Sequence, residues 1–323
     1  MLNPLAAPGG SEWLPGGLTQ GVVLMARGTA RAHAIFRRQA VAAWTFLAVP
    51  IVFYVGIRLL PAIDAFWLSL NDWNLLSPPH YVGLRNYARL LHDPIFWKVF
   101  ANTVLYLLAG LPISLVLSLA IALLLDRVRF LTGFLQALYF LPFLTTAVAM
   151  AWVWRWLYLP APMGLFNDIL VWFGLPQQPF LRSTVEALPS ALAPAIWAGL
   201  GFQIIVFLAG LRAIPAEYYE AGQVDGVSRV RIFLDITLPL LRPTFLFLVV
   251  LGSIGFLRIF DLVYNLTTDD LGGPLNASKP LVLLIYQTAF TSFDMGYAAA
   301  QTVVLFLALL ALSIFQLRAM RDR

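Results

Sequence analysis

Seven charged side chains lie close together in one polar stretch, residues 217–243, between two long apolar runs. The stretch reads EYYEAGQVDGVSRVRIFLDITLPLLRP, and its charged residues are Glu217, Glu220, Asp225, Arg229, Arg231, Asp235 and Arg242. Their spacing is helical, so the sequence predicts short amphipathic helices outside the bilayer. The chemistry that such helices offer is docking, because a groove on another protein can bury the apolar face and pair the charges.

No catalytic chemistry is expected from the remaining residues. Cysteine is absent, which excludes disulfides and thiolate sites, and the three histidines, His33, His80 and His92, are scattered over tails and loops. No Ser–His–Asp set can be assembled, and no metal site is expected. The phosphate-binding pattern G-x-x-x-x-G-K-[ST] is missing, as is any Gly-Lys dipeptide. ATP hydrolysis would therefore occur on a separate chain, and no Lys/Arg run indicates nucleic-acid binding.

The first helix of the polar stretch has recognisable start and stop signals. Pro215 suits a first helical turn, where its missing N–H is harmless. Glu217 and Glu220 follow near the positive end of the helix dipole. Gly226 can adopt the left-handed conformation that ends a helix. The sequence therefore predicts one helix that ends at this glycine.

A second helix is predicted from Ser228, a suitable N-cap, to about Leu238. Pro239 and Pro243 then interrupt the chain before the next apolar run. The apolar positions of the pair are Tyr218, Ala221, Val224, Val227, Ile232 and Ile236. A solvated connector remains the alternative, although it would use about 30 residues where ~2–8 are usual.

The rest of the chain predicts an integral membrane protein. Hydrophobic residues make up 60% of it and charged residues 11%, whereas soluble domains average roughly 25% charged. A helix needs about 20 apolar residues to cross the hydrocarbon core. Six such runs are present, at about 40–62, 99–125, 131–156, 188–211, 244–266 and 297–317. The predicted fold class is all-α, with six transmembrane helices.

The distribution of arginine and lysine predicts the orientation. With the N-terminus inside, thirteen of these residues lie in cytoplasmic segments and six lie outside. The positive-inside rule then places both termini in the cytoplasm, and the polar stretch with them. We expect residues 1–35 to form a cytoplasmic tail and residues 36–323 to form the transmembrane domain.

The polar stretch resembles the EAA loop of permease subunits in binding-protein-dependent ABC importers. Glu220-Ala221-Gly222, three residues, Gly226, nine residues and Ile236-Thr237-Leu238-Pro239 reproduce the spacing of that motif. Gly222 departs from it, because the family usually has alanine there. Glycine costs a helix about 1 kcal/mol relative to alanine.

The resemblance extends to the sugar-type permeases, relatives of the maltose-transporter membrane subunits. The segments FWLSLNDWNL, YVGLRNYARLLHDPIFWKVFANTVLY, FDLVYNLT, GGP and FDMGYAAA carry it. It implies a type I ABC importer permease fold, with a coupling helix between the fourth and fifth spans, in about 214–243. It also implies an ATPase-coupling role for Glu217, Glu220, Ala221, Gly222, Asp225, Gly226, Ile236, Leu238 and Pro239. Glu220 is expected to pair with an arginine of the ATPase.

The same resemblance implies the partners and the location. We expect two ATPase subunits that carry ATP and Mg²⁺, a second and different permease subunit, and an extracytoplasmic binding protein. The loop from Thr267 to Pro274 is expected to contribute to the contact with that protein. The substrate is expected to be a sugar or a sugar-like solute. The location is expected to be the plasma (inner) membrane of a bacterium or archaeon.

Eight residues are candidates for the substrate path: Trp197, Gly199, Phe202, Gln203, Gly252, Phe256, Arg258 and Asp261. Trp197 could stack on a sugar ring, and Gly199 would let the ring approach the backbone. Arg258 and Asp261 are three residues apart in the fifth span and could form an internal ion pair or line the path. Ala195 and Phe256 are apolar where the sugar-holding subunit has polar residues, which leaves open which permease subunit holds the substrate.

Two other classes of protein remain as alternatives. A secondary transporter would work alone on an ion gradient, and many of these proteins show internal repeats and midplane charges. A membrane-embedded enzyme would need clustered nucleophiles or metal ligands near an interface, and none is found in the sequence.

Overall fold

The computed structural model describes residues 39–128 and 131–321. The predicted tail, residues 1–35, lies outside the described residues. The chain divides into two compact units, Met1–Asp64 and Ala65–Arg323. The described part of the first unit belongs to one apolar helix, which runs over Gln39–Leu68 and so continues past the unit boundary. It contains a π-helical turn, η1 (Val55–Leu59), and ends with α2 (Leu60–Leu68).

The second unit is almost entirely helical. After α2, its elements as far as α8 are β1 (Asn71–Asp72), β2 (His80–Tyr81), α3 (Arg85–His92), α4 (Pro94–Arg127), α5 (Thr132–Leu144), α6 (Ala147–Leu157), α7 (Leu165–Trp172), η2 (Phe180–Arg182) and α8 (Ala187–Arg212). The two strands pair antiparallel, with Asn71 opposite Tyr81.

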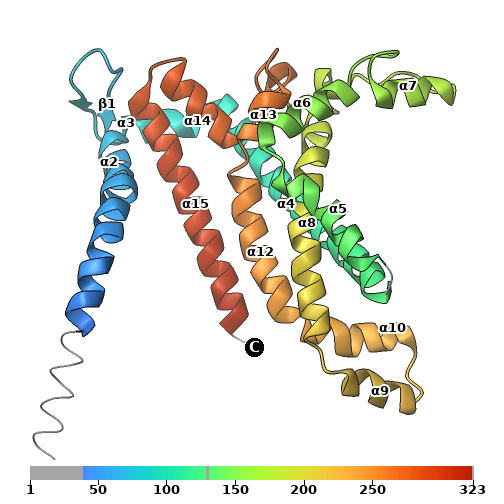
Figure 1. Cartoon of the computed structure of the whole chain (residues 1–323). Helices are drawn as coiled ribbons and strands as arrows, with labels where there is room; N and C mark the ends of the chain where they lie inside the picture. Colours follow the sequence, from blue (N-terminus) through green and yellow to red (C-terminus); the bar gives the residue numbers. More distant parts are fainter. Residues whose placement is uncertain (1–38, 129–130, 322–323) are drawn as a thin grey trace, which may run out of the picture. The chain divides into compact units, whose positions relative to one another are not determined.

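The remaining elements include the polar stretch and the C-terminal helix. They are α9 (Ala216–Val224), α10 (Arg229–Ile232), η3 (Phe233–Thr237), α11 (Leu238–Leu240), α12 (Arg242–Leu257), α13 (Asp261–Leu266), η4 (Pro274–Asn276), α14 (Leu281–Phe290) and α15 (Met295–Arg321). Within this unit, α9 and α10 lie on the side where α15 ends, while α7, α13 and α14 lie on the opposite side (Figure 1).

Four described helices are long and apolar enough to cross a membrane, and two bent helix pairs pass the same test. The four helices are Gln39–Leu68, α4, α8 and Met295–Ala319 of α15. The bent pairs are α5 with α6, and Arg229–Leu240 with α12. The structure therefore has four candidate spans, or six if each pair is counted as one.

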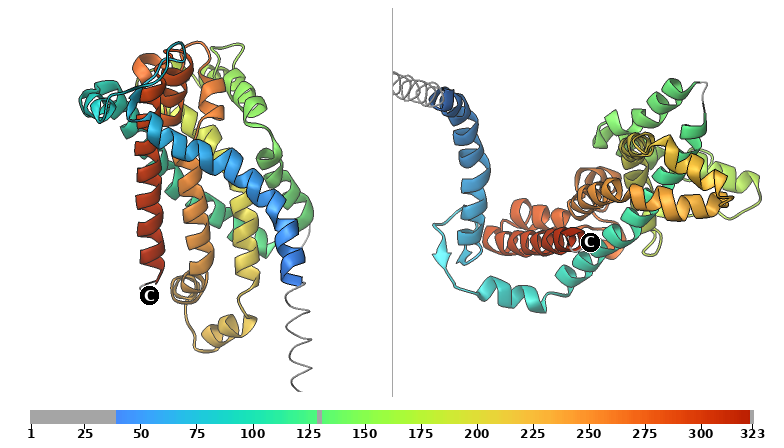
Figure 2. Two further views of the ribbon diagram at one scale, coloured as in Figure 1. Left: turned by 90° about the vertical axis from the view of Figure 1, so that its left-hand side faces the viewer. Right: turned by 90° about the horizontal axis from the view of Figure 1, so that it is seen from below.

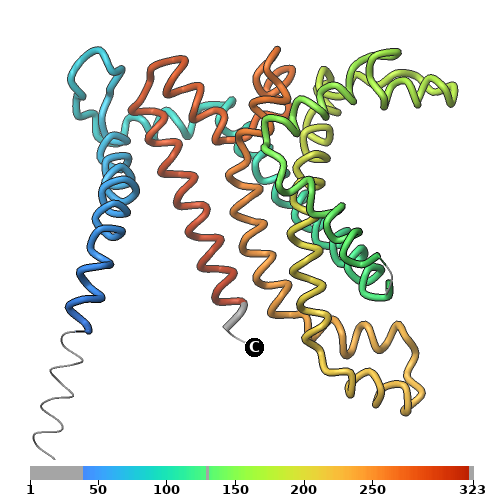
Figure 3. The backbone as a smooth tube through the Cα atoms, viewed as in Figure 1, coloured from blue at the N-terminus to red at the C-terminus, as the bar shows by residue number. Residues whose placement is uncertain are grey.

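The third predicted span, 131–156, is wrong as a single helix. The chain bends by 98° between α5 and α6, as the tube in Figure 3 shows. Pro142 lies near the end of α5 and has no N–H to continue the hydrogen-bond ladder. Thr146 then starts α6, because its Oγ1 accepts a hydrogen bond from the Ala149 N–H at 3.3 Å.

The fifth predicted span, 244–266, is also interrupted. Helix α12 ends at Leu257, Phe260 has a non-helical conformation, and α13 begins at Asp261. An acidic residue is favourable at a helix start, because it faces the positive end of the helix dipole. By contrast, Pro112 and Pro194 lie inside α4 and α8 without ending these helices.

The core of the second unit forms along the contact between α4 and α8. Toward the C-terminal ends of both helices, Leu119 and Leu125 of α4 pack with Phe207 and Leu211 of α8 and with Leu241. Nearer the other end, buried residues from α4, α6, α8, α12 and α13 form a second cluster around Tyr106. The axes of the long helices α8, α12 and α15 are roughly parallel, and the chain runs through α12 in the direction opposite to α8 and α15 (Figures 1 and 2).

Side chains of α4 hold the loop after α13 in place. Asn102 donates to the backbone carbonyls of Asn276 and Lys279, at 2.8 and 3.1 Å. The Tyr106 hydroxyl donates to the Ser278 carbonyl at 2.8 Å, and both groups are buried. These bonds satisfy backbone groups that a helix or sheet would otherwise pair. The loop therefore has a fixed conformation against α4.

The outward surfaces of the long helices are apolar. Val116 of α4 and Phe315 of α15 are 66% and 69% exposed, and many similar side chains surround them. A soluble monomer rarely exposes contiguous apolar patches of this extent. These surfaces fit contact with lipid or with other membrane-spanning chains.

Candidate functional site

The polar stretch folds as the helix–turn–helix that the sequence predicts. Helix α9 leads directly from the end of α8, and the second helix, Arg229–Leu240, leads directly into α12. In Figure 1 both helices lie beyond the lower ends of α8 and α12, and the view from below in Figure 2 shows them at the end of α8. The pair thus connects two of the long helices.

The start and stop of α9 are those predicted. Pro215 is the N-cap residue, and Glu217 lies in the first turn. Gly226 has a φ of +69°, which glycine adopts without strain. The Val227 N–H donates to the Gly222 carbonyl at 2.9 Å, and the Gly226 N–H donates to Gln223 at 3.1 Å. These two bonds form a Schellman motif, which satisfies the last carbonyls of the helix.

The two helices pack against each other through Gly222. A Cβ atom placed on Gly222 would lie 3.4 Å from both Ile232 Cγ1 and Ile236 Cδ1. This is ordinary van der Waals contact, so alanine would fit, but a larger side chain would not. With glycine at this position, a small space remains between the two helices, and their contact is not strained.

The opposite face of α9 is exposed in the part of the chain that the structure describes. Helical geometry places Glu217, Glu220, Ala221 and Val224 on one face, and all four are exposed. The Val224 side chain is 87% exposed. A carboxylate pair beside an exposed valine on a short, anchored helix is suited to a groove with a basic residue.

The second helix begins at Ser228, whose Oγ accepts a hydrogen bond from the Arg231 N–H at 3.4 Å. It passes through a π-helical turn, η3, and bends by 63° from α12 next to Leu241. The bend follows Pro239 and precedes Pro243, as predicted. Leu241 itself is fully buried among core residues, so the bend is packed and not loose.

Four of the eight predicted path residues line one pocket, namely Gly199, Gln203, Gly252 and Phe256. The pocket has a volume of about 320 Å³ and lies among α5, α6, α8 and α12. Its other walls are mainly apolar, including Ala195, Ile196, Met150 and Ile259. Only Ser114, Thr145 and Gln203 offer polar side chains to it.

Two serines of α4 hold Gln203, and sequence reasoning missed them. Ser118 Oγ donates to Gln203 Oε1 at 3.0 Å, and Gln203 Nε2 donates to Ser114 Oγ at 3.3 Å. All three residues are buried. The sequence does contain an indication of this contact, because the two serines are four residues apart and lie on one face of a mainly apolar span. The three side chains join α4 to α8 beside the pocket.

The other four predicted path residues do not line this pocket. Trp197 is 41% exposed and packs edge-on against Trp154, with the ring centres 5.8 Å apart. Phe202 stacks on Phe143 at 5.4 Å. Arg258 and Asp261 are exposed on either side of the break after α12. The predicted continuous helical face is therefore wrong, and in the described part of the chain these two residues form no ion pair.

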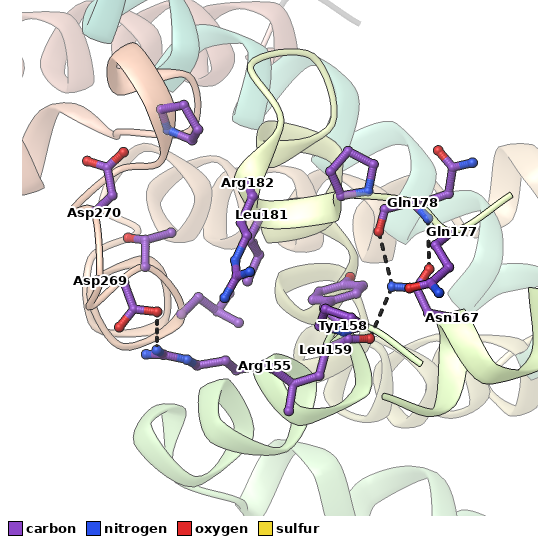
Figure 4. A pocket seen from close by; sticks show the side chains of 15 residues that line it. Arg155, Tyr158, Leu159, Asn167, Gln177, Gln178, Leu181, Arg182, Asp269 and Asp270 are labelled. Carbon is purple, nitrogen blue, oxygen red and sulfur yellow. Dashed lines mark hydrogen bonds and ion pairs between the residues drawn. The ribbon is translucent and has the colours of Figure 1, made fainter. Parts of the chain in front are cut away.

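A second pocket, of about 460 Å³, opens on the side opposite α9 (Figure 4). It is formed by the segment between α6 and α8 and by the loop after α13. Arg155 joins these two segments, because its guanidinium donates to Thr268 and pairs with Asp269. Asn167 is buried and bonds to the backbone of Leu159 and Gln178. The sequence analysis did not identify Arg155 as a link between the segments.

The loop after α13 also buries a cation. Lys279 is 8% exposed, and burial lowers the pKa of its ammonium group, while the nearby Asp270 acts in the opposite direction. A Cβ atom on Gly272 would overlap the Lys279 side chain, at 2.4 Å from its Cβ. Glycine at this position therefore lets the loop close over the lysine.

The chain matches a described protein family over most of its length. Residues 94–323 match the family "Binding-protein-dependent transport system inner membrane component". The trehalose/maltose transport system permease protein MalF of Thermococcus litoralis is 33% identical over 278 residues, covering 86% of this chain and 91% of that protein. The lactose transport system permease protein LacF of Rhizobium radiobacter is 31% identical over 285 residues, covering 87% and 94%.

The fold is also similar to a solved structure. A chain in the crystal structure of a bacterial ABC transporter involved in the import of the acidic polysaccharide alginate superposes with a TM-score of 0.78. The match covers 90% of this chain and 99% of that chain, at 22% sequence identity. At this identity the likeness concerns the fold.

The contact at Gly222 leads to a testable prediction for the helix pair. Gly222→Ala should slow hydrogen exchange of the α9 amides, because alanine favours the helix by up to about 1 kcal/mol and fits the available space. Gly222→Leu should speed that exchange, since the added atoms must displace Ile232 and Ile236 at a cost of about 1–3 kcal/mol. Faster exchange in Gly222→Ala would show that the interhelix contact is tighter than described.

Proposed function

Because this chain belongs to the family of inner-membrane components of binding-protein-dependent transport systems, we propose that it is the permease subunit of an ATP-driven importer for a sugar or sugar-like solute. The near full-length similarity to the trehalose/maltose and lactose permeases carries the proposal. The solute would arrive on an extracytoplasmic binding protein and cross between alternating outward-facing and inward-facing states.

The proposed topology has six spans with both termini in the cytoplasm. Each bent helix pair then counts as one crossing, and α9 and α10 lie on the cytoplasmic side. The excess of arginine and lysine on that side supports this orientation. The placement of α9 on the same side as the end of α15 is consistent with it (Figure 1).

ATP hydrolysis is proposed to occur on two separate ATPase subunits, which would hold ATP and Mg²⁺. The outward face of α9, with Glu217, Glu220 and Val224, would seat in a cleft of one of them. Glu220 would pair there with an arginine, and such a pair fixes the register of docking. The roles of Ala221, Gly222, Asp225, Gly226, Ile236, Leu238 and Pro239 would be to shape and anchor the two helices.

The order of the helices along the chain suggests how a movement of the docked helix pair would be transmitted to the pocket. Gly199 and Gln203 lie on α8, which runs into α9, while Gly252 and Phe256 lie on α12, which follows the second helix. A rotation of the helix pair by the ATPase would therefore move both walls of the pocket. Rigid-body motion is the usual way in which packed helices transmit such a change.

The pocket is proposed as this subunit's part of the substrate path. Its few polar groups cannot bond all hydroxyl groups of a sugar, so a second, different permease subunit would provide further polar contacts. The apolar walls would face the C–H surfaces of the sugar. Trp197, Phe202, Arg258 and Asp261 would act on the path only in another conformation, since none of them lines the pocket here.

The extracytoplasmic pocket is proposed to receive part of the binding protein. Arg155 holds the segment between α6 and α8 against the Thr267–Pro274 loop, so both present one surface (Figure 4). Asp270 and Arg182 add one charge of each sign to that surface. No observation favours the alternative of a carrier driven by an ion gradient.

Uptake by reconstituted vesicles tests the proposal. Vesicles that contain this chain with its second permease, its ATPase and the binding protein should take up trehalose, maltose or another sugar only when ATP reaches the ATPase. Glu220→Ala should reduce uptake at least about tenfold, because truncating a buried charge pair costs about 2–5 kcal/mol. Asp168→Ala, which removes an exposed carboxylate on α7, is the matched control and should retain uptake. Uptake by this chain alone on a proton or sodium gradient would contradict the proposal.

Filling the pocket provides a separate prediction. Gly199→Leu places a side chain into the space beside Gln203, so uptake should fall at least about tenfold while the complex still assembles and hydrolyses ATP. Ala209→Leu also introduces a leucine on α8, at an exposed position away from the pocket, and it should have no effect. Equal uptake by the two variants would remove the pocket from the substrate path.

A further inference from the structure

A third pocket lies on the membrane-facing side of the helix pair. It has a volume of about 1020 Å³ and is formed by the ends of α4 and α8 together with α9, α10 and η3. Tyr219 and Gln223 contribute from α9. Helical geometry turns these two residues away from Glu217 and Val224, while Gln223 adjoins Glu220, three residues before it. The pocket therefore borders the surface that is proposed to bind the ATPase, and its arginines lie outside α9.

The charged groups at this pocket are mainly positive. Arg127, at the end of α4, and Arg229, at the start of α10, both line it, and both are exposed. Neither arginine pairs with a carboxylate within residues 39–128 and 131–321. Asp126 also lines the pocket, but Arg212 lies 3.6 Å from it and compensates its charge. Two guanidinium groups are thus available for an anion.

The rest of the lining is apolar. Leu123 of α4, Leu211 of α8, and Ile232 and Phe233 of the second helix form the walls. Arg127 and Arg212 are the last residues of two helices that are long enough to span the membrane, so the pocket lies at the boundary where each helix leaves the hydrocarbon. A cationic rim above apolar walls matches an amphipathic anion.

We propose that this pocket binds the headgroup of an anionic phospholipid, with its phosphate between Arg127 and Arg229. Basic pockets between helices on the cytoplasmic side are suited to anionic headgroups, and the guanidinium fork matches phosphate oxygens. The apolar walls would contact the first part of an acyl chain. A lipid in this position would connect the end of α4 to the second helix of the pair. The inference concerns a ligand that is not transported, so it goes beyond the proposed function.

Native mass spectrometry of the purified transporter complex tests the site. Complex taken from vesicles of phosphatidylglycerol and phosphatidylcholine should retain phosphatidylglycerol in preference. Retention should weaken about fivefold in Arg127→Gln or Arg229→Gln, and about thirtyfold in the double variant, because each arginine near the surface adds a similar attraction. Arg318→Gln is the matched control, since Arg318 is exposed on the same side but lies outside the pocket.

A double lysine variant tests whether the positive charge at the two positions is sufficient to hold the lipid. The double change to lysine, Arg127→Lys with Arg229→Lys, keeps both charges and should retain most of the lipid. Inorganic phosphate should not displace the lipid, because it lacks the chain that the apolar walls contact. Displacement by phosphate would reassign the pocket to a soluble anion and overturn the lipid proposal.

Three further results would also overturn it. They are equal retention of both lipids by the wild-type complex, retention by the double glutamine variant, and loss of retention in Arg318→Gln. If the double glutamine variant loses its ATPase subunit but keeps the lipid, the pocket is a protein contact instead. Failure of the lipid site would leave ATP-driven uptake intact, so the two proposals can be tested independently.

Discussion

Hydrocarbon gives a spanning chain no water to bond to its backbone, and this constraint arranges the rest of the molecule. Every peptide group inside the bilayer has to be paired within a helix, so polar and irregular segments collect at the two ends of the long helices. The polar helix pair lies at one end. The loop after α13, which hydrogen bonds from α4 hold in place, and the pocket around Arg155 lie at the other. The two sides that communicate in an importer are thereby separated by helices alone.

Two features make those helices suitable for transmitting a movement. Only residues 213–215 separate α8 from α9, and the bend at Leu241, where the second helix meets α12, is buried in the core. Inside the bundle, Gln203 with Ser114 and Ser118 connects α8 to α4 through buried hydrogen bonds. Such bonds are costly to leave unpaired in an apolar surrounding, so α8 and α4 should move together. The pocket wall on α12 is then the part that can move against them.

Local signals made the helix pair predictable. Pro215, Gly226 and Ser228 act through their own backbone and side-chain chemistry, and the structure places each at the predicted cap or turn. The break after Leu144 was not predictable from hydropathy, because the apolar composition soon resumes beyond it. The break after Leu257 coincides with Arg258 and Asp261, which the sequence analysis placed on one helix. The partners of Gln203 and Arg155 lie 85 and 114 residues away, so they depend on tertiary packing. Trp197 was expected to line the substrate path because of its residue type and position. In the structure it packs against Trp154 outside the pocket.

The central claim is that the exposed face of α9 seats in an ATPase subunit. The chain has no cysteine, so Val224→Cys places a single thiol on that face, and Leu76→Cys places one in the exposed loop between β1 and β2 as a control. Strand β1 lies on the side of the unit opposite α9 (Figure 1). Each variant can be labelled with a benzophenone maleimide in the assembled transporter and then irradiated. The label at position 224 should form a covalent product with the ATPase subunit, and the label at position 76 should not. An assembled transporter in which position 224 gives no such product would contradict the account.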